Sequence, residues 1–292
     1  MEIIIYVLYS LGNNFTINNY YKLKIIKKIG EGTYGYVFSI NTDLVIKIFK
    51  NYSELTDKDE TNLLPKKNEN REVKFFIDLL NSKYKNNEYL INVNAVGIIK
   101  YINGNKLDLV NNYCLILPKC NPITNLINLW KMPLINNKDG KEIVLNFMKR
   151  LIEIELFLNK NFNITNLDSK LSNYMIQKST KLMINNILAI DFGLVIKNNN
   201  VNYDFKKNYY IWPLGNDINI KYISPYSICM NGLLLFLGEE KVKKNNVKQN
   251  LKYLIADKDF YNIFNECLLL KSNCENFKKM ILDYMKKNKF KH

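Results

Sequence analysis

The stretch that decides the fold reads Asp168-Ser169-Lys170-Leu171-Ser172-Asn173, and Asp191-Phe192-Gly193 follows it downstream. The first stretch places a carboxylate, a lysine two residues later and an amide three residues beyond the lysine in one short loop. The second stretch adds another carboxylate. Carboxylates accept protons, a lysine ammonium binds anions, and carboxylate and amide oxygens coordinate magnesium. This combination predicts a site that handles a proton, an anion and a metal ion together.

Phosphoryl transfer is the chemistry that needs these groups, because it requires a positioned nucleophile and cations around the transferred phosphate. We expect Asp168 to accept or orient the proton of the attacking hydroxyl, and Lys170 to neutralise charge on the γ-phosphate. Asn173 and Asp191 are the expected ligands of Mg2+. The Asp-x-Lys-x-x-Asn pattern is weak evidence by itself, because lysine and asparagine are abundant in this chain. The neighbouring sequence has to support it.

The neighbouring sequence predicts a helix before this loop and two strands after it. Residues Glu142–Phe157 carry apolar side chains at a helical period and have an almost wholly apolar character, which suits a buried helix. Tyr174–Ile176 and Ile187–Ile190 are short apolar runs typical of strands, and the second ends at Asp191. The stretch between them predicts a hairpin around Ser179–Asn186. Helix, loop, strand, strand and carboxylate form a specific order.

Glycines recur nearer the N-terminus, in Gly30-Glu31-Gly32-Thr33-Tyr34-Gly35-Tyr36-Val37. Because glycine has no Cβ, backbone amides in such a turn approach phosphate oxygens closely. We expect strands at Tyr21–Ile29, Tyr36–Ile40 and Leu44–Phe49. A dinucleotide-binding turn would open a helix after the glycines. The β-rich sequence that follows them favours a phosphate-binding turn between two strands.

The third of these strands carries Val45-Ile46-Lys47 in an apolar setting. A lysine is costly to bury without a partner, so a carboxylate should lie close to it. The helix expected at Arg71–Leu80 offers Glu72, and Glu69 is the alternative. The sequence therefore predicts an ion pair between this strand and this helix.

Glycine turn, lysine, glutamate, Asp-x-Lys-x-x-Asn and Asp-Phe-Gly occur here in the order typical of eukaryotic-type protein kinases, and about Tyr21 to Leu235 resembles that family. The resemblance implies an α+β, bilobal fold. Residues 1–119 would form a small antiparallel N-lobe with one helix, and residues 120–292 a mainly helical, trimmed C-lobe. Strands at Val96–Ile102 and Tyr113–Leu117 would complete a five-stranded N-lobe.

The resemblance also implies a binding site for ATP. The residues it assigns to ATP are Gly30, Gly32, Gly35, Val37, Val45, Lys47, Glu72, Leu117, Pro118 and Cys120. Lys47 would bind the α- and β-phosphates, with Glu72 as its partner. Leu117 would be the gatekeeper, and backbone groups of Pro118 and Cys120 would contact adenine. Lys170, two residues after the base, resembles the Ser/Thr-directed pattern, so protein serine and threonine hydroxyls are the expected substrates.

Several positions depart from the family pattern. Asn166-Leu167 stands where the family has His-Arg, which removes the usual clamp for a phosphorylated activation loop. Ile211-Trp212-Pro213-Leu214 lacks the glutamate of Ala-Pro-Glu, and Ser224-Pro225-Tyr226 is the alternative register. Ser227 replaces the aspartate of the next helix. These losses keep a pseudokinase scaffold open as the second hypothesis. A small-molecule kinase is the third, and Lys170 speaks against it.

Composition narrows the remaining possibilities. The chain has 292 residues, of which 47% are hydrophobic, and this fits two folded lobes. Its net charge is +15, but Arg71 and Arg150 are the only arginines. The shortage of the residue best suited to phosphate and base contacts makes a dedicated nucleic-acid role unlikely. Five cysteines without a Cys-x-x-Cys pair favour a reduced, intracellular setting, the cytoplasm.

We further expect a monomer without a transmembrane segment, whose partner is a protein substrate. Met1–Leu11 is interpreted as a packed arm or strand, because it lacks a basic leader and a small-residue cleavage site. The trimmed C-lobe and the AT-rich composition resemble kinases encoded by large DNA viruses, which would place the protein in the host cytoplasm.

Overall fold

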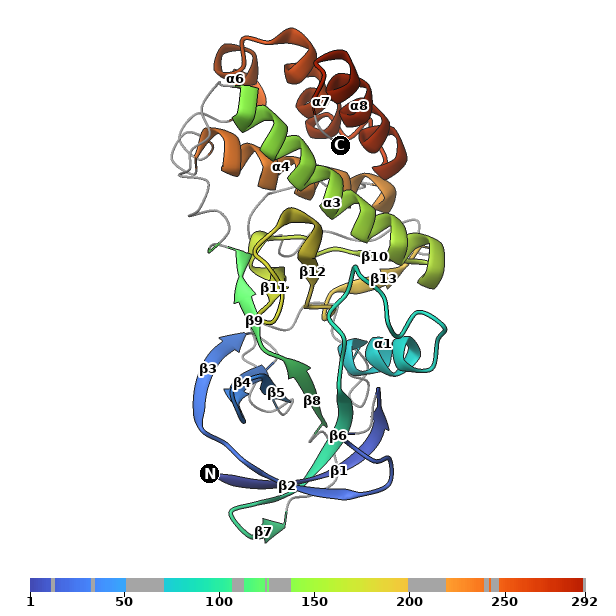
Figure 1. Ribbon diagram of the computed structural model, residues 1–292. Helices are drawn as coiled ribbons and strands as arrows, with labels where there is room; N and C mark the ends of the chain where they lie inside the picture. The colour runs from blue at the N-terminus through green and yellow to red at the C-terminus, as the bar shows by residue number, and fades with distance from the viewer. Residues whose placement is uncertain are drawn as a thin grey trace. The chain divides into compact units, whose positions relative to one another are not determined.

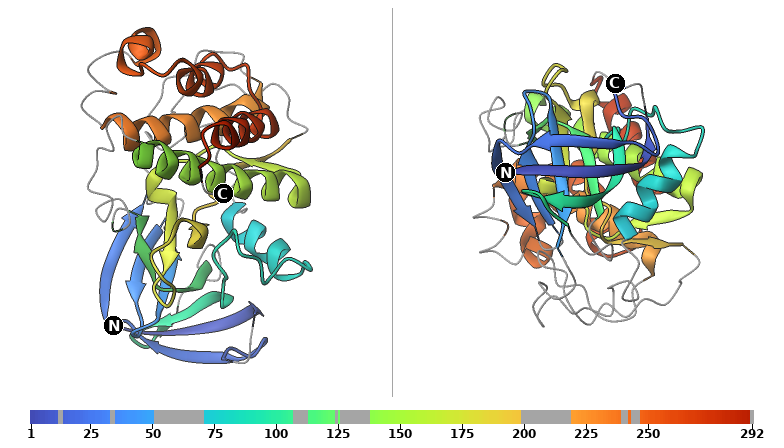
Figure 2. Two further views of the ribbon diagram at one scale, coloured as in Figure 1. Left: turned by 45° about the horizontal axis from the view of Figure 1, so that its top comes forward. Right: turned by 90° about the horizontal axis from the view of Figure 1, so that it is seen from below.

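The computed structural model describes residues 1–11, 14–32, 35–50, 71–106, 113–123, 125, 138–198, 219–238, 242 and 247–290. The chain divides into two compact units, whose elements are labelled in Figure 1 and seen from two further sides in Figure 2. The first unit contains Met1–Asn121, Gln177–Lys181 and Ile190–Leu194. The second contains Pro122–Ile176, Leu182–Ala189 and Val195–His292. Two short segments from late in the chain, one with Asp-Phe-Gly, thus belong to the first unit.

An antiparallel sheet forms most of the first unit. Its strands are β1 (Glu2–Ser10), β2 (Tyr20–Lys24), β3 (Lys27–Gly32), β4 (Gly35–Ser39), β5 (Leu44–Phe49), β6 (Ala95–Ile102), β7 (Asn105–Lys106) and β8 (Tyr113–Pro118). Their order is β2-β1-β6-β8-β5-β4-β3, and β7 pairs with β6. The expectation of five strands was therefore too low. The additional pairings are those of β1, β2 and β7 on the side of β6.

β1 confirms the expectation of a strand at the N-terminus. It pairs with β2 on one side and with β6 on the other. Ile3, Ile5 and Val7 alternate along it and are fully buried. Together with Ile46 of β5 and Ile116 of β8 they form the core of the sheet. The first ten residues are thus part of the folded unit.

The single strand expected at Tyr21–Ile29 was wrong, because the chain changes partners in its middle. The backbone N–H of Ile25 donates to the carbonyl of Met1, and that of Ile26 donates to the carbonyl of Ser39. The residues before this point pair with β1, and those after it pair with β4 at the opposite edge of the sheet. An apolar run predicts extended backbone, but it does not identify the partner strand.

Helix α1 (Arg71–Leu80) belongs to the first unit and contacts β1, β6 and β8. Val73, Phe76, Leu79 and Leu80 are buried, which confirms the apolar face predicted for this helix. Glu72 is buried with them, although it is charged. The helix therefore carries a carboxylate into the interior of the unit.

The second unit is mainly helical. Its helices are α3 (Lys138–Phe162), α4 (Ile223–Leu237), α6 (Val247–Leu254), α7 (Lys258–Leu268) and α8 (Cys274–Lys287). Helix α3 is the predicted buried helix, extended at both ends, and Figure 2 shows α4 packed beside it. Gly232 makes this approach possible, because a Cβ there would lie 2.8 Å from Cγ of Met148.

Short strands and 3-10 turns connect these helices. They are β9 (Cys120–Pro122), β10 (Ile164–Asn166), η3 (Leu171–Asn173), β11 (Tyr174–Gln177), η4 (Ile184–Asn186), β12 (Ile187–Ala189), β13 (Val195–Lys197) and η5 (Ile220–Tyr222). Strands β11 and β12 pair antiparallel, with Tyr174 opposite Ala189, which confirms the hairpin predicted after the Asp168 loop. Strand β10 pairs with β13. The loop that carries Asp168 therefore lies between two short pairs of strands.

Residues Ile220–Leu237 are long and apolar enough to cross a membrane by length and composition. Of this segment 83% is buried inside the protein. That degree of burial is what the central helix of a helical unit would show.

Candidate active site

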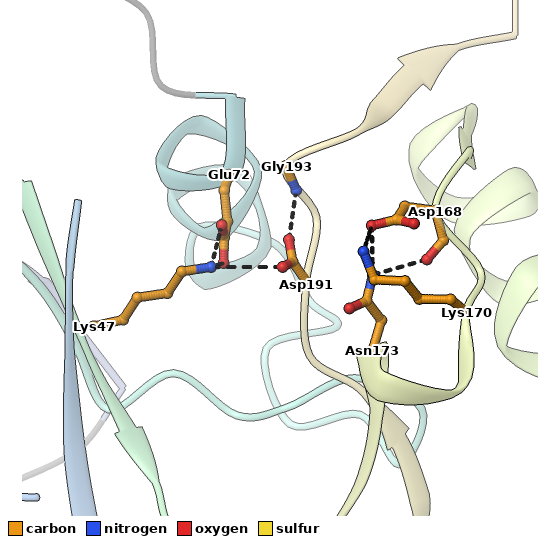
Figure 3. Close-up of polar contacts among 7 residues, drawn as sticks. All are labelled: Lys47, Glu72, Asp168, Lys170, Asn173, Asp191 and Gly193. Atoms are coloured by element: carbon orange, nitrogen blue, oxygen red, sulfur yellow. Dashed lines mark hydrogen bonds and ion pairs between the residues drawn. The ribbon is translucent and has the colours of Figure 1, made fainter. Parts of the chain in front are cut away.

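In the first unit, an ion pair joins β5 to α1 (Figure 3). Nζ of Lys47 lies 2.7 Å from Oε1 and 2.6 Å from Oε2 of Glu72. The exposed fractions of the two side chains are 12% and 1%. Glu72 is thus the partner that the buried lysine required, whereas Glu69 lies outside the described residues.

Asp191 lies beside this pair and completes a cluster of three charges. Its Oδ2 is 3.9 Å from Nζ of Lys47, and the backbone N–H of Gly193 donates to its Oδ1 at 3.0 Å. Burial alone would lower the pKa of Lys47, but the carboxylates of Asp191 and Glu72 outweigh burial and raise it. Burial raises the pKa of Glu72 to about 7, although Lys47 opposes that shift. The lysine therefore stays cationic between two carboxylates.

Phe192 fixes the position of this segment against α1. It is fully buried, and its ring centroid lies 4.4 Å from that of Phe75 and 5.4 Å from that of Phe76. Aromatic pairs at these separations add to the stabilisation that burial provides. Because Phe192 adjoins Asp191 in the chain, the same packing positions the third charge of the cluster.

The glycine turn connects β3 and β4, with Gly32 opposite Gly35 and Gly30 opposite Val37. The tip, Thr33 and Tyr34, lies outside the described residues. A Cβ at Gly35 would lie 2.8 Å from the carbonyl oxygen of Ile48, so the fold itself requires this glycine. A Cβ at Gly30 would make only ordinary contacts with Val37. A Cβ at Gly32 would have no atom of the described residues within 4 Å.

The residues expected around adenine lie on β4, β5 and β8. Val37 is opposite Lys47, and Val45 is opposite Leu117. Because Val45 and Lys47 are two residues apart on β5, all four side chains lie on one face of the sheet. Val45 and Leu117 are both buried. The register of β5 thus places an apolar residue and the buried lysine on the same face.

Some backbone groups of the segment after β8 already form hydrogen bonds within the protein. Pro118 ends β8, and the next residue, Lys119, donates its N–H to Asp43 and accepts from the N–H of Lys178. Burial raises the pKa of the Cys120 thiol to about 12, so this cysteine is neutral near pH 7. Both backbone groups of Lys119 are therefore hydrogen-bonded within the protein. The residues on either side of it, Pro118 and Cys120, are those whose backbone groups the family resemblance assigns to adenine.

In the second unit, the Asp168 loop is tied together by its own side chains (Figure 3). Oδ2 of Asp168 accepts from Nζ of Lys170 at 2.5 Å and from Nδ2 of Asn173 at 2.9 Å. Nδ2 of Asn173 also donates to the carbonyl of Asp168 at 2.8 Å. The backbone N–H of Asp168 donates to Oδ1 of Asn166. A carboxylate, an ammonium and an amide are therefore held together in one compact turn.

Sequence reasoning missed Glu155, which lies behind this loop on α3. It is fully buried and accepts from Ser169, from Ser224 and from the backbone of Asn166. The sequence did indicate that Glu155 is buried, because this residue falls on the apolar stripe of its helix between Leu151 and Leu158.

The helix that follows was expected to carry Ser227 where the family has an aspartate. Two side chains of α4 bond the loop, and one of them is Ser224, whose hydroxyl lies 3.1 Å from the carbonyl of Asn166. From the same helix, Nδ2 of Asn231 donates to the carbonyl of Ser169 at 2.6 Å. The segment Ile211–Leu214, expected to resemble Ala-Pro-Glu, lies outside the described residues.

The donor chemistry at these residues suits magnesium. Asp191 is one-third exposed, and Asn173 carries an amide oxygen, so both offer the hard oxygen donors that magnesium prefers. Among the described residues, no group of three or more His, Cys, Asp or Glu side chains could hold a metal by itself. A metal bound at Asp191 of the first unit, or at Asn173 of the second, would share its coordination with a ligand such as phosphate.

Comparison with known proteins identifies the fold. No protein-family profile and no curated protein sequence matches the chain. Among solved structures, it is similar to "ROP18 kinase domain in complex with AMP-PNP and sucrose", with a TM-score of 0.59 and 12% identity over 100% of this chain and 88% of that one. It is also similar to "Crystal structure of BubR1 kinase domain", with a TM-score of 0.56 and 16% identity over 96% and 85% of the two chains. The chain therefore has a protein-kinase-like, α+β fold.

Proposed function

We propose that the protein is an ATP-dependent kinase that transfers the γ-phosphate to serine or threonine hydroxyls of protein substrates. The observation that carries the proposal is the buried pair of Lys47 and Glu72 beside Asp191. A buried ion pair contributes little net stability, because desolvation offsets the attraction between the charges. Its place in the interior is therefore better explained by a ligand that needs a fixed cation.

The glycine turn supports a nucleotide as that ligand. The packing of the protein explains glycine at position 35, but it does not explain Gly30 and Gly32, where a side chain would have room. Phosphate oxygens that accept from the backbone at these positions would account for both. One similar structure is titled a complex with AMP-PNP, which agrees with a nucleotide site in this fold.

The Asp168 loop supplies the chemistry of transfer. Asp168 would accept the proton of the substrate hydroxyl while the hydroxyl oxygen forms a bond to the γ-phosphorus. The bond from that phosphorus to the bridging oxygen breaks, and ADP leaves. Lys170, 2.5 Å from Asp168, would neutralise charge on the transferred group. Asn173 in this loop and Asp191 in the first unit each offer an oxygen to magnesium, which when bound would neutralise charge on the phosphates.

Two alternatives are distinguished by particular residues. A pseudokinase scaffold is suggested by Asn166-Leu167, by the missing Ala-Pro-Glu glutamate and by Ser227 in place of an aspartate. Against it, the lysine, the glutamate and both aspartates are present, and Lys47 pairs with Glu72 as a buried lysine requires. A small-molecule kinase is less well supported, because Lys170 follows the Ser/Thr-directed pattern of the protein kinases.

Transfer of labelled phosphate from ATP and Mg2+ to a generic protein substrate tests the proposal. We expect labelled protein that yields phosphoserine or phosphothreonine on hydrolysis. Phosphotyrosine would contradict the assigned specificity. Thermal stabilisation by ATP without any transfer would instead support the scaffold.

A further inference from the structure

Glu155 of α3 is a buried charge that the proposed reaction does not use. Its exposed fraction is 0%, and no lysine or arginine among the described residues forms an ion pair with it. A carboxylate in such a place is costly unless hydrogen bonds replace its water. Three donors do so, Ser224 Oγ at 3.0 Å, Ser169 Oγ at 3.1 Å and the backbone N–H of Asn166 at 3.4 Å.

Two of these three donors lie on either side of Asp168 in the chain. Asn166 is two residues before it, and Ser169 is the next residue. Asn166 in turn accepts from the backbone N–H of Asp168 through its Oδ1 at 2.9 Å. One carboxylate therefore holds both ends of the turn that presents Asp168, whereas Lys170 and Asn173 bond the Asp168 carboxylate itself.

We propose that Glu155 is a positioning residue, which fixes the loop Asn166–Ser169 and thereby the direction of the Asp168 carboxylate. The inference rests on the proposed function, in which Asp168 accepts the substrate proton. A general base that is displaced by a fraction of an ångström loses much of its effect, because catalysis depends on near-attack geometry. Through its hydrogen bonds to Asn166 and Ser169, Glu155 would therefore affect turnover without contacting the reacting atoms.

The ionised form of Glu155 is the form that can hold the loop. A carboxylate accepts from all three donors, whereas a carboxylic acid or an amide has one oxygen fewer to offer. The serine hydroxyls could turn and accept instead, but the backbone N–H of Asn166 can only donate. Protonation of Glu155 turns one of its two acceptor oxygens into a donor and removes the charge that strengthens these bonds. It should therefore weaken the hold on that N–H, and the loop should loosen as the pH falls.

The surroundings locate this change near neutral pH. Burial raises the pKa of Glu155 to about 7, and the bonds from Ser224, Ser169 and Asn166 oppose the shift. Of the titratable groups near it, Tyr174 of β11 and Cys274 of α8 have pKa values well above their ordinary ranges, mainly through burial, and stay neutral. Strands β10 and β12 carry no titratable side chain. The charged residues of the loop are Asp168 and Lys170, which stand on either side of Ser169 in the chain.

The test compares Glu155→Gln with Glu153→Gln, the same change two residues earlier on the same helix. Glu153 is partly exposed and pairs with Lys278, away from the loop. Two quantities are measured between about pH 6 and 8.5, amide hydrogen exchange of the segment 164–170 and kcat with KM for ATP. We expect Glu155→Gln to speed exchange of this segment and to lower kcat roughly 10- to 100-fold with little change in KM. The wild-type protein should lose protection as the pH falls through 7, and Glu155→Gln should not change further.

The outcomes test the positioning role of Glu155 and the proposed function separately. If the segment exchanges equally in both variants, the positioning role is wrong, and the same holds if it loosens while kcat is unchanged. If the wild-type protein shows no transfer at any pH, the proposed function fails, and the exchange data still decide whether Glu155 holds the loop. Should Glu155→Gln not fold, Ser224→Ala removes one donor without changing α3 and should loosen the same segment.

Discussion

At the scale of single residues, substitutions of the buried pair Lys47 and Glu72 distinguish a role in ATP binding from a role in stability. Removing one partner alone should destabilise the fold by about 3 to 5 kcal/mol, because the other charge stays buried without it. The double variant Lys47→Met/Glu72→Met replaces both charges by apolar side chains of similar length. We expect it to unfold at about the wild-type denaturant concentration or above, yet to show no thermal stabilisation by ATP. Lys22→Met, at an exposed surface pair, is the matched control.

Persistence of the ATP response in that double variant would contradict the role of Lys47. A large loss of stability would show instead that the fold depends on the pair. Unfolding by denaturant and thermal stabilisation by ATP are measured independently, so the role in stability and the role in ATP binding are tested separately.

At the scale of elements, the turn between β3 and β4 contains two glycines with different reasons to be glycine. Gly35→Ala should destabilise the protein by about 1 to 3 kcal/mol, because its Cβ would meet the carbonyl of Ile48. Gly32→Ala should change stability by less than about 0.5 kcal/mol, since no atom of the described residues lies within 4 Å of a Cβ there. If phosphates occupy that space, Gly32→Ala should weaken ATP binding measured by calorimetry. Equal ATP affinity in Gly32→Ala and the wild-type protein would remove the support that this turn gives to nucleotide binding.

The elements also show what could be predicted from the sequence. Helix α1 and the β11–β12 hairpin follow from local periodicity, which needs no knowledge of distant residues. The exchange of partners between Ile25 and Ile26 depends on Met1 and Ser39, whose positions no local pattern specifies. For the same reason the pairing of β1 with β6, almost a hundred residues away, was not predicted.

The candidate site was predicted in part for a related reason. Lys47 and Glu72 were expected to pair because a buried charge requires a partner, and Asp168, Lys170 and Asn173 are close in the chain. Glu155 was missed because its partners are serines and a backbone group, which carry no charge to match. The bond from Ser224 to the loop could not be read from the sequence, since it depends on how α4 packs on α3.

At the scale of the whole molecule, Asp257 links three helices of the second unit and should make stability depend on acid. It caps α7 through the N–H groups of Asp259 and Phe260, and it accepts from Lys141 of α3 and Tyr284 of α8. Burial alone would raise its pKa, but these bonds lower it to about 2. Because its pKa is lower in the folded than in the unfolded state, its stabilisation is present above about pH 4 and disappears as the pH falls toward 2.

The matched variant is Asp257→Asn, which keeps a good capping residue and removes the charge. At neutral pH it should be less stable than the wild-type protein by about 1 kcal/mol, and the difference should vanish below about pH 2, as measured by urea unfolding. A difference that stays constant from neutral pH to about pH 2 would show that the carboxylate charge is not the cause.

The central claim is that the protein transfers phosphate and that Asp168 is its base. The most direct measurement follows transfer from labelled ATP by the wild-type protein, Asp168→Asn and Asp191→Ala, with ATP binding measured on each. Asp283→Asn, at an exposed position of α8, controls for the substitution itself. We expect Asp168→Asn to abolish transfer and to keep ATP binding, whereas Asp191→Ala should also weaken magnesium-dependent binding. Equal residual transfer by the two variants, or transfer by Asp168→Asn at the wild-type rate, would contradict the account.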